Sequence, residues 1–237
     1  MILAVDCGNT RLKWGLYHSG VWRRTGAAPI AEMESLEERW RKFRALDRAV
    51  VANVAGASAR AKLGGIFARL RLSVLWVEAK RRECGVTNGY SRPAQLGADR
   101  WAALIGAWRT VQGPCLVVMA GTATTADILK SNGRFAGGVI LPGLDLMKRS
   151  LSENTAGLPQ TPGRFSPWPR KTADAMETGC LLAQAGAIEH IFATLDRGAR
   201  CLLAGGAAAR IAPHLRIRAR KAENLVLEGL VRIAVSE

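Results

Sequence analysis

The architecture of this chain is set by residues 2–10, ILAVDCGNT. The apolar start predicts a short buried strand, the Asp-Cys-Gly-Asn-Thr sequence predicts a turn, and residues 12–17 predict a returning strand. A carboxylate at a strand end, followed by a glycine-opened turn, places backbone N–H groups and short polar side chains around an anion. We therefore expect a phosphate-binding hairpin, although an ordinary Asn-containing β-turn shares this local sequence.

A second passage of the same kind occupies residues 115–129, CLVVMAGTATTADIL. It predicts a strand, a Gly/Thr-rich turn and a returning strand, and such self-similarity indicates two related halves of one design. Helices and strands alternate between the two passages, which favours an α/β fold. We expect an N-terminal domain over residues 1–113 and a C-terminal domain over residues 114–237.

Several polar residues near these turns suit nucleotide chemistry. In the first turn Asp6 can hold a hydrated Mg²⁺, and Lys13 can reach a terminal phosphate. Two such hairpins facing each other would form a phosphate clamp, and this pairing favours the functional interpretation over two ordinary turns. The remaining candidates for the clamp are Gly8, Asn9 and Thr10 in the first turn and Gly121, Thr122 and Thr124 in the second.

Two further segments carry candidate site residues. Gly205-Gly206 is either a simple helix entry or a side-chain-free turn on which a flat adenine can lie. Asp99 has two interpretations. It is a helix N-cap or first-turn acid, or it is a general base for a hydroxyl, with Arg100 as an anion clamp.

The other elements alternate as an α/β chain should. Four prolines in residues 157–171 predict a loop or lid there. Helices are expected over residues 32–46, 58–70, 96–111, from Thr172 as N-cap to about 195, and from 222, with strands over 49–54, 72–77, 199–203 and 215–217.

Composition indicates a globular protein. The 237 residues are 49% hydrophobic and 22% charged, enough apolar sequence to exclude a disordered tail or a disulfide-stapled miniprotein. We expect no membrane span and a cytoplasmic location, because no apolar run approaches about 20 residues and Asp6 interrupts the apolar start. The charge of +15 is dispersed and carries no reader motif, so nucleic acid is not the expected partner.

Four motifs appear in a specific order along the chain. They are Asp6-x-Gly8-Asn9-Thr10, Tyr90-x-x-Pro93-x-x-Leu96-Gly97-x-Asp99-Arg100-Trp101, Gly121-Thr122-Ala123-Thr124-x-x-Asp127 and Gly137-Gly138-x-Ile140-x-Pro142-Gly143. Together they resemble the type III pantothenate kinases, also known as Bvg accessory factor-like proteins.

The resemblance implies a fold and a reaction. The fold is two tandem ribonuclease-H-like domains of the acetate and sugar kinase, heat-shock chaperone and actin superfamily, in a homodimer. The reaction is ATP-dependent phosphorylation of pantothenate to 4′-phosphopantothenate, the first step of coenzyme A biosynthesis. By resemblance Asp99 is the catalytic base, Asp127 binds a monovalent cation (K⁺ or NH₄⁺), and the pantothenate contacts are Tyr90, Gly97, Arg100 and Thr172.

Two alternatives use the same broad fold. One is a regulatory relative that binds nucleotide without turnover. The other is a nuclease or nucleic-acid-binding protein that uses Asp6, Asp99 and Asp127 as a two-metal carboxylate set. The neutral Gly/Thr turns argue against the second alternative.

Overall fold

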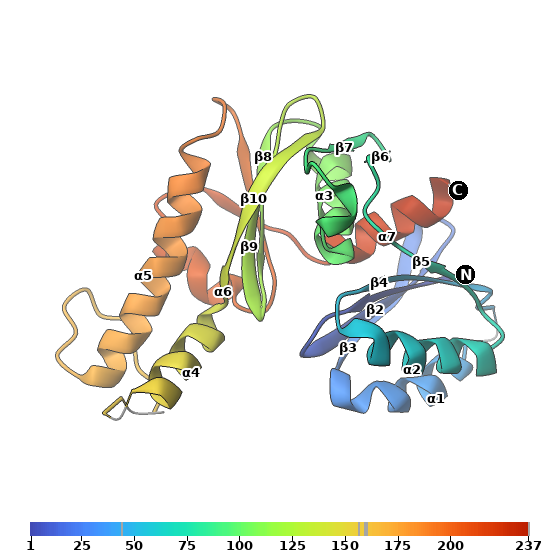
Figure 1. Cartoon of the computed structure of the whole chain (residues 1–237), viewed down its shortest axis with the longest axis horizontal. Coiled ribbons are helices and arrows are strands. Elements are labelled where there is room, and N and C mark those ends of the chain that lie inside the picture. Colours follow the sequence, from blue (N-terminus) through green and yellow to red (C-terminus); the bar gives the residue numbers. More distant parts are fainter. Residues whose placement is uncertain (44, 156, 159–160, 237) are drawn as a thin grey trace. The chain divides into compact units, whose positions relative to one another are not determined.

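The chain folds into two compact units. The computed structural model describes residues 1–43, 45–155, 157–158 and 161–236 (Figure 1). Unit 1 comprises Met1–Gln112, Gly133–Phe135 and Asn224–Glu237, and unit 2 comprises Gly113–Asn132 and Ala136–Glu223. Residues 224–237, which the sequence analysis grouped with the C-terminal half, thus belong to unit 1.

Unit 1 is built on a five-stranded mixed sheet. Its strand order is β3-β2-β1-β4-β5, with β1 antiparallel to β2 and parallel to β4. The parallel pairing brings the carboxyl ends of β1 and β4 to the same sheet edge, which is where ligands bind in open α/β sheets. The strands are β1 (Ile2–Cys7), β2 (Arg11–His18), β3 (Val21–Pro29), β4 (Arg48–Asn53) and β5 (Ser73–Trp76).

Helices cover this sheet because alternate strand residues point to opposite faces. Leu3, Val5 and Cys7 of β1 share one apolar cluster with buried residues of α1 (Leu36–Arg41) and α2 (Gly56–Arg69). A 3₁₀ helix, η1 (Ile30–Ser35), precedes α1, so the single helix expected over residues 32–46 is wrong. The remaining helices, α3 (Ala98–Val111) and α7 (Leu225–Ser236), pack against each other and against β4.

A small hairpin completes unit 1. It consists of β6 (Arg82–Glu83) and β7 (Val86–Asn88), followed by the 3₁₀ turn η2 (Pro93–Gln95). Residues 134 and 135, the first of β10, pair in parallel with β7. The sequence analysis did not predict this hairpin.

Unit 2 repeats the strand order of unit 1. Its strands run β12-β11-β8-β9-β10; β8 is antiparallel to β9 and parallel to β11, as β1 is to β2 and β4. The internal repeat inferred from the two turn sequences is therefore present in the topology. The strands are β8 (Cys115–Ala120), β9 (Ala123–Leu129), β10 (Arg134–Pro142), β11 (Arg200–Ala204) and β12 (Ala219–Lys221).

The helices of unit 2 lie on one apolar cluster with β8 and β11. They are α4 (Leu144–Asn154), α5 (Thr172–Phe192), α6 (Ala208–Ile211) and the 3₁₀ turn η3 (Ala212–His214). Helix α4 was not predicted, the strand expected over residues 215–217 lies instead at β12, and the last helix begins at Leu225. Residues 157–158 and 161–171 contain no helix or strand, and residues 159–160 lie outside the described residues.

Within the part of the chain that the structure describes, every helix is too short or too polar to cross a bilayer.

Glycines set how closely α3 and α7 approach. A Cβ at Gly229 would overlap the Ala102 carbonyl, and one at Gly106 would overlap the Leu225 carbonyl. Gly64 of α2, in contrast, has nothing within 4 Å of a built Cβ. The two α3–α7 positions therefore need glycine for backbone contact, although glycine is a poor helix former.

We expect Gly229→Ala to lower the free energy of unfolding by about 1–3 kcal/mol, the usual cost of overpacking. The matched control Gly64→Ala should leave stability unchanged or raise it by up to about 1 kcal/mol, because alanine favours the helix. Urea unfolding followed by circular dichroism measures both. Equal destabilisation by the two variants would contradict the close-packing argument.

Candidate active site

The first turn follows β1 at the carboxyl edge of the unit 1 sheet. The Gly8 N–H donates to the Arg11 carbonyl at 3.1 Å, and the Val54 N–H donates to the Cys7 carbonyl at 3.0 Å. Asn9 and Thr10 are exposed at the tip. The turn thus presents short polar side chains to solvent, as an anion-binding hairpin requires.

Asp6 lies opposite Lys13 in the β1–β2 ladder. The pKa of Asp6 is raised to about 7, mainly by burial and further by the charge of Asp99, while Lys13 partly offsets the shift. A carboxyl group with such a pKa is costly to ionise where it stands. A cation that binds near Asp6 would therefore stabilise its ionised form.

Asp99 lies in the first turn of α3, where a negative charge is favoured by the helix dipole. Its Oδ1 accepts the Arg100 N–H at 2.8 Å, and a Cβ at Gly97 would lie only 2.6 Å from that oxygen. Gly97, rather than Asp99, is the N-cap residue. Burial raises the pKa of Asp99, against the lowering effect of Arg100.

Asp6 and Asp99 lie close enough for the charge of Asp99 to raise the pKa of Asp6. They come from β1 and from the start of α3, about 90 residues apart in the sequence. Gly97 lies close to Val54, whose side chain is 3.7 Å from a Cβ built on Gly97. The structure therefore brings together two of the acids that the sequence analysis singled out.

Arg100 and Tyr90 are also joined. Arg100 Nη1 donates to the Tyr90 hydroxyl at 3.2 Å, and the guanidinium lies over the rings of Tyr90 and Phe135, at 5.8 and 5.9 Å from their centroids. Arg100 is only 6% exposed. A buried guanidinium next to Asp99 is well suited to orient an anionic substrate group.

In unit 2 the second turn lies beside the Gly205 turn. The Gly121 N–H donates to the Ala123 carbonyl at 3.0 Å, and the Ala207 N–H donates to the Ala120 carbonyl at 3.1 Å. Gly205 has a φ of 104° and no room for a Cβ against Ala120, so only glycine fits this position. Since β8 and β11 are parallel neighbours, the two turns share one carboxyl edge, and Gly206 is exposed there.

The threonines of the second turn differ in exposure. Thr122 is exposed, whereas Thr124 is fully buried. Thr122 is therefore the better placed of the two to contact a ligand through its side chain.

Two residues that the sequence analysis gave no role support the second turn. The Gly143 N–H donates to the Thr122 carbonyl at 2.9 Å, and a Cβ at Gly143 would overlap the Gly121 and Thr122 carbonyls. The fully buried Gln184 of α5 donates from Nε2 to the Pro142 carbonyl at 2.8 Å. Gly143 belongs to a motif quoted above, but a lone glutamine in a long helix carries no sequence signal.

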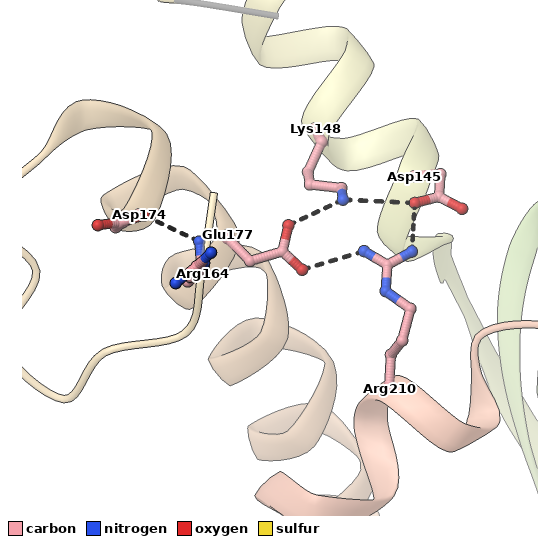
Figure 2. Close-up of polar contacts among 6 residues, drawn as sticks. All are labelled: Asp145, Lys148, Arg164, Asp174, Glu177 and Arg210. Carbon is pink, nitrogen blue, oxygen red and sulfur yellow. Dashed lines mark hydrogen bonds and ion pairs between the residues drawn. The ribbon is translucent and has the colours of Figure 1, made fainter. Parts of the chain in front are cut away.

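Figure 2 shows a charged network that links α4, α5 and α6. Arg210 donates to Asp145 at 2.7 Å and to Glu177 at 3.0 Å, and Lys148 donates to Glu177 at 2.8 Å. The hydrogen bond from Arg210 is the main cause that lowers the pKa of Asp145. The network fixes the first turns of α4, directly after Gly143.

Asp127 and Thr172 complete the predicted set in unit 2. Asp127 is fully buried in β9 opposite Val117, and a Cβ at Gly138 would overlap its Oδ1. Thr172 is exposed as the first residue of α5, whose N-cap is Lys171 rather than Thr172. Among the described residues no three His, Cys, Asp or Glu side chains form a metal-binding group.

The sequence matches one protein family over most of its length. A family model described as type III pantothenate kinase matches residues 2–194. A type III pantothenate kinase from Azoarcus sp. strain BH72 is 52% identical over 241 residues, covering 100% of this chain and 92% of that relative.

Solved structures share the fold at low identity. A Campylobacter jejuni protein described as a Baf family transcriptional activator has a TM-score of 0.66 at 23% identity, covering 99% of this chain and 98% of that one. A Sinorhizobium meliloti protein described as a 2-dehydro-3-deoxygalactonokinase has a TM-score of 0.65 at 14% identity, covering 100% and 99%. These likenesses show the fold, and the predicted α/β fold class is confirmed.

The raised pKa of Asp6 predicts a pH-dependent stability. Protonation of Asp6 stabilises the fold fully below its unfolded pKa of 3.8, and that stabilisation is lost as the pH rises through about 7. Relative to Asp6→Asn, the parent protein should lose up to about 1.4 kcal/mol per pH unit across this window and little above it. Urea unfolding of both proteins between pH 4.5 and 8.5 measures the difference. A difference that stays constant with pH would contradict the buried-acid account.

Proposed function

The chain belongs to the type III pantothenate kinase family, and we propose that it transfers the γ-phosphoryl group of ATP to the primary hydroxyl of pantothenate. The product is 4′-phosphopantothenate, and the reaction is the first step of coenzyme A biosynthesis. The observation that carries the assignment of roles is the Asp6–Asp99 pair, in which burial raises both pKa values. Phosphoryl transfer to an alcohol needs a base for the hydroxyl proton and a cation for the phosphates. Asp99, with its raised pKa, suits the first role, and Asp6 suits the binding of the cation.

Asp99 is the general base in this proposal. Its Oδ1 is held by the Arg100 N–H, so the carboxylate keeps one orientation toward the substrate hydroxyl. A raised pKa makes it a stronger base once it is ionised, and it accepts the hydroxyl proton as the new P–O bond forms. Arg100 and Tyr90 orient the substrate, with the buried guanidinium facing the pantothenate carboxylate, and Gly97 and Thr172 are the other proposed pantothenate contacts.

Asp6 would hold Mg²⁺. The residues present fit this ion, because a desolvated carboxylate next to a second acid favours a cation, and Mg²⁺ commonly binds through one or two carboxylates plus waters and phosphates. When bound, Mg²⁺ neutralises charge on the transferring phosphoryl group. Lys13, opposite Asp6, adds a positive charge for the terminal phosphate.

The turns supply the rest of the ATP site. We assign Gly8, Asn9 and Thr10 to one part of the phosphate chain and Gly121, Thr122 and Thr124 to another. The adenosine is assigned to Gly205 and Gly206. The absence of a Cβ at the exposed Gly206 supports this assignment, because a built Cβ there meets nothing within 4 Å and the backbone is open to a flat base.

The proposal includes a monovalent cation, K⁺ or NH₄⁺, at Asp127. Asp127 is fully buried, and a Cβ built on Gly138 would overlap its Oδ1. A buried carboxylate is a suitable charge for such an ion. A rate of ADP release that is equal in K⁺ and Na⁺ buffers would count against this part.

The proposal also includes a homodimer formed through α5. Gly179, Leu182, Ala183 and Gly186 are exposed at spacings of three and four, which places them on one helix face. Leu182 is 52% exposed, and small residues beside it would allow a second helix to approach closely. Light scattering should give a mass near twice the 25.5 kDa of one chain.

A cytoplasmic location is the remaining part of the proposal. All five cysteines are free thiols, as is usual in a reducing compartment, and the donor ATP is made there.

We expect Asp99→Asn to lower kcat by about 10²–10⁴-fold, the usual contribution of a general base, with little change in KM for ATP. The matched control Asp196→Asn removes the same charge from an exposed residue and should stay within about twofold of the parent. A coupled assay of ADP release, with and without pantothenate, measures all three proteins.

Retention of activity within tenfold by Asp99→Asn would exclude the base role. ATP binding by the parent without any pantothenate-dependent turnover would instead select a regulatory relative.

A further inference from the structure

The hairpin that precedes Tyr90 contains an arginine with an unusual set of contacts. Strands β6 and β7 pair Arg82 with Thr87, and the Asn88 N–H donates to the Arg81 carbonyl at 2.9 Å. Arg81 therefore stands opposite Asn88, where the hairpin ends and the segment leading to Tyr90 begins.

The guanidinium of Arg81 donates to three backbone carbonyls. Its Nη1 lies 3.3 Å from the Asn88 oxygen and 3.0 Å from the Tyr90 oxygen, and its Nη2 lies 3.2 Å from the Ser91 oxygen. A planar guanidinium offers several N–H groups in a fixed fork, whereas a lysine ammonium is a compact point donor. One arginine side chain thus fixes the backbone of residues 88–91.

Asn88 also binds this segment through its side chain. Its Oδ1 accepts the Tyr90 N–H at 3.0 Å, and its Nδ2 donates to the Pro93 carbonyl at 3.3 Å. Asn88 is only 1% exposed, so it is itself held by packing. The carbonyls of the turn are bound by Arg81 and its Tyr90 amide by Asn88, which leaves the Tyr90 backbone little freedom.

The hairpin and its turn are also tied to the start of α3. Trp101 Nε1 donates to Glu83 Oε2 at 2.8 Å, and Arg100 Nη1 donates to the Tyr90 hydroxyl at 3.2 Å. Asp99, the proposed base, immediately precedes these two residues. The position of Tyr90 is therefore coupled to the orientation of Arg100 in the first turn of α3.

We propose that Arg81 is a positioning residue for the phosphate acceptor: it fixes the 88–91 turn, so that Tyr90 holds the Arg100 guanidinium in the orientation that binds the acceptor's carboxylate. This inference rests on the proposed function of Arg100 and Tyr90. Arg81 acts through Tyr90 and does not itself touch the substrate.

The main test compares steady-state kinetics of Arg81→Ala with those of Arg82→Ala. Arg82 is the next residue of the hairpin and is exposed, so its removal takes away the same charge. We expect Arg81→Ala to raise KM for pantothenate at least tenfold, with kcat and KM for ATP within threefold of the parent. Arg81→Lys should have a KM for pantothenate between those of the parent and of Arg81→Ala. Arg82→Ala should keep its KM for pantothenate within twofold of the parent.

A double-mutant cycle separates positioning from general stabilisation. If Arg81 acts through Tyr90, Arg81→Ala should change KM for pantothenate less than twofold in a Tyr90→Ala background. Multiplicative effects in the cycle would overturn the proposal. So would equal effects of Arg81→Ala and Arg82→Ala, or a loss of kcat and melting temperature without a change in KM.

Hydrogen exchange tests the proposal without turnover. In the full-length protein, Arg81→Ala should speed exchange of the Tyr90 amide at least tenfold, and Arg82→Ala should not. Unchanged exchange in Arg81→Ala would overturn the positioning role whatever the protein's activity. Faster exchange in Arg81→Ala, together with no pantothenate-dependent turnover by the parent, would instead mean that Arg81 fixes the turn and that the proposed function is wrong.

Discussion

Two desolvated carboxylates, Asp6 and Asp99, lie near each other in unit 1, and the candidate site of that unit depends on them. Each loses solvation in the folded chain, and their mutual repulsion adds to the pKa of Asp6. Only part of this cost is offset, by Lys13 across the β-ladder and by Arg100 and its backbone amide. The remaining cost of ionisation would be reduced by a cation that binds next to the two carboxylates.

Helix α3 sets the directions in which three side chains of the candidate site point. Successive residues of a helix point about 100° apart, so Asp99, Arg100 and Trp101 project in three directions from one turn. Asp99 acts on Asp6, Arg100 reaches Tyr90, and Trp101 binds Glu83. The contact of α3 with α7 through Gly106 and Gly229 fixes the axis from which all three project. A small rotation of this helix would change the proposed base, the proposed anion clamp and the hairpin contact together.

The sequence predicted the parts of the site that have a short, regular signature. Apolar strands ending in glycine turns located both hairpins, and their recurrence predicted the repeated topology. The hairpin with Arg81 was missed because its strands have two and three residues, too few for an alternating pattern. The strand β12 was misplaced because an edge strand, here mostly exposed, needs no apolar residues. Gln184 could not be assigned from sequence, since its role depends on a carbonyl 42 residues away.

The two units use one topology but secure their turns by different means. In unit 1 the strand β1 places an acid, Asp6, directly before its last residue. The corresponding position of β8 is Met119, which pairs with Ala204 of β11 as Asp6 pairs with Ala52 of β4. Unit 2 therefore has no acid at this strand position, and its turn packs closely against backbone at Gly143 and Gly205. Two turns of different chemistry, one with an acid and one without, can thus arise from one repeated strand order, because the chemistry depends on single side chains at the strand ends rather than on the sheet.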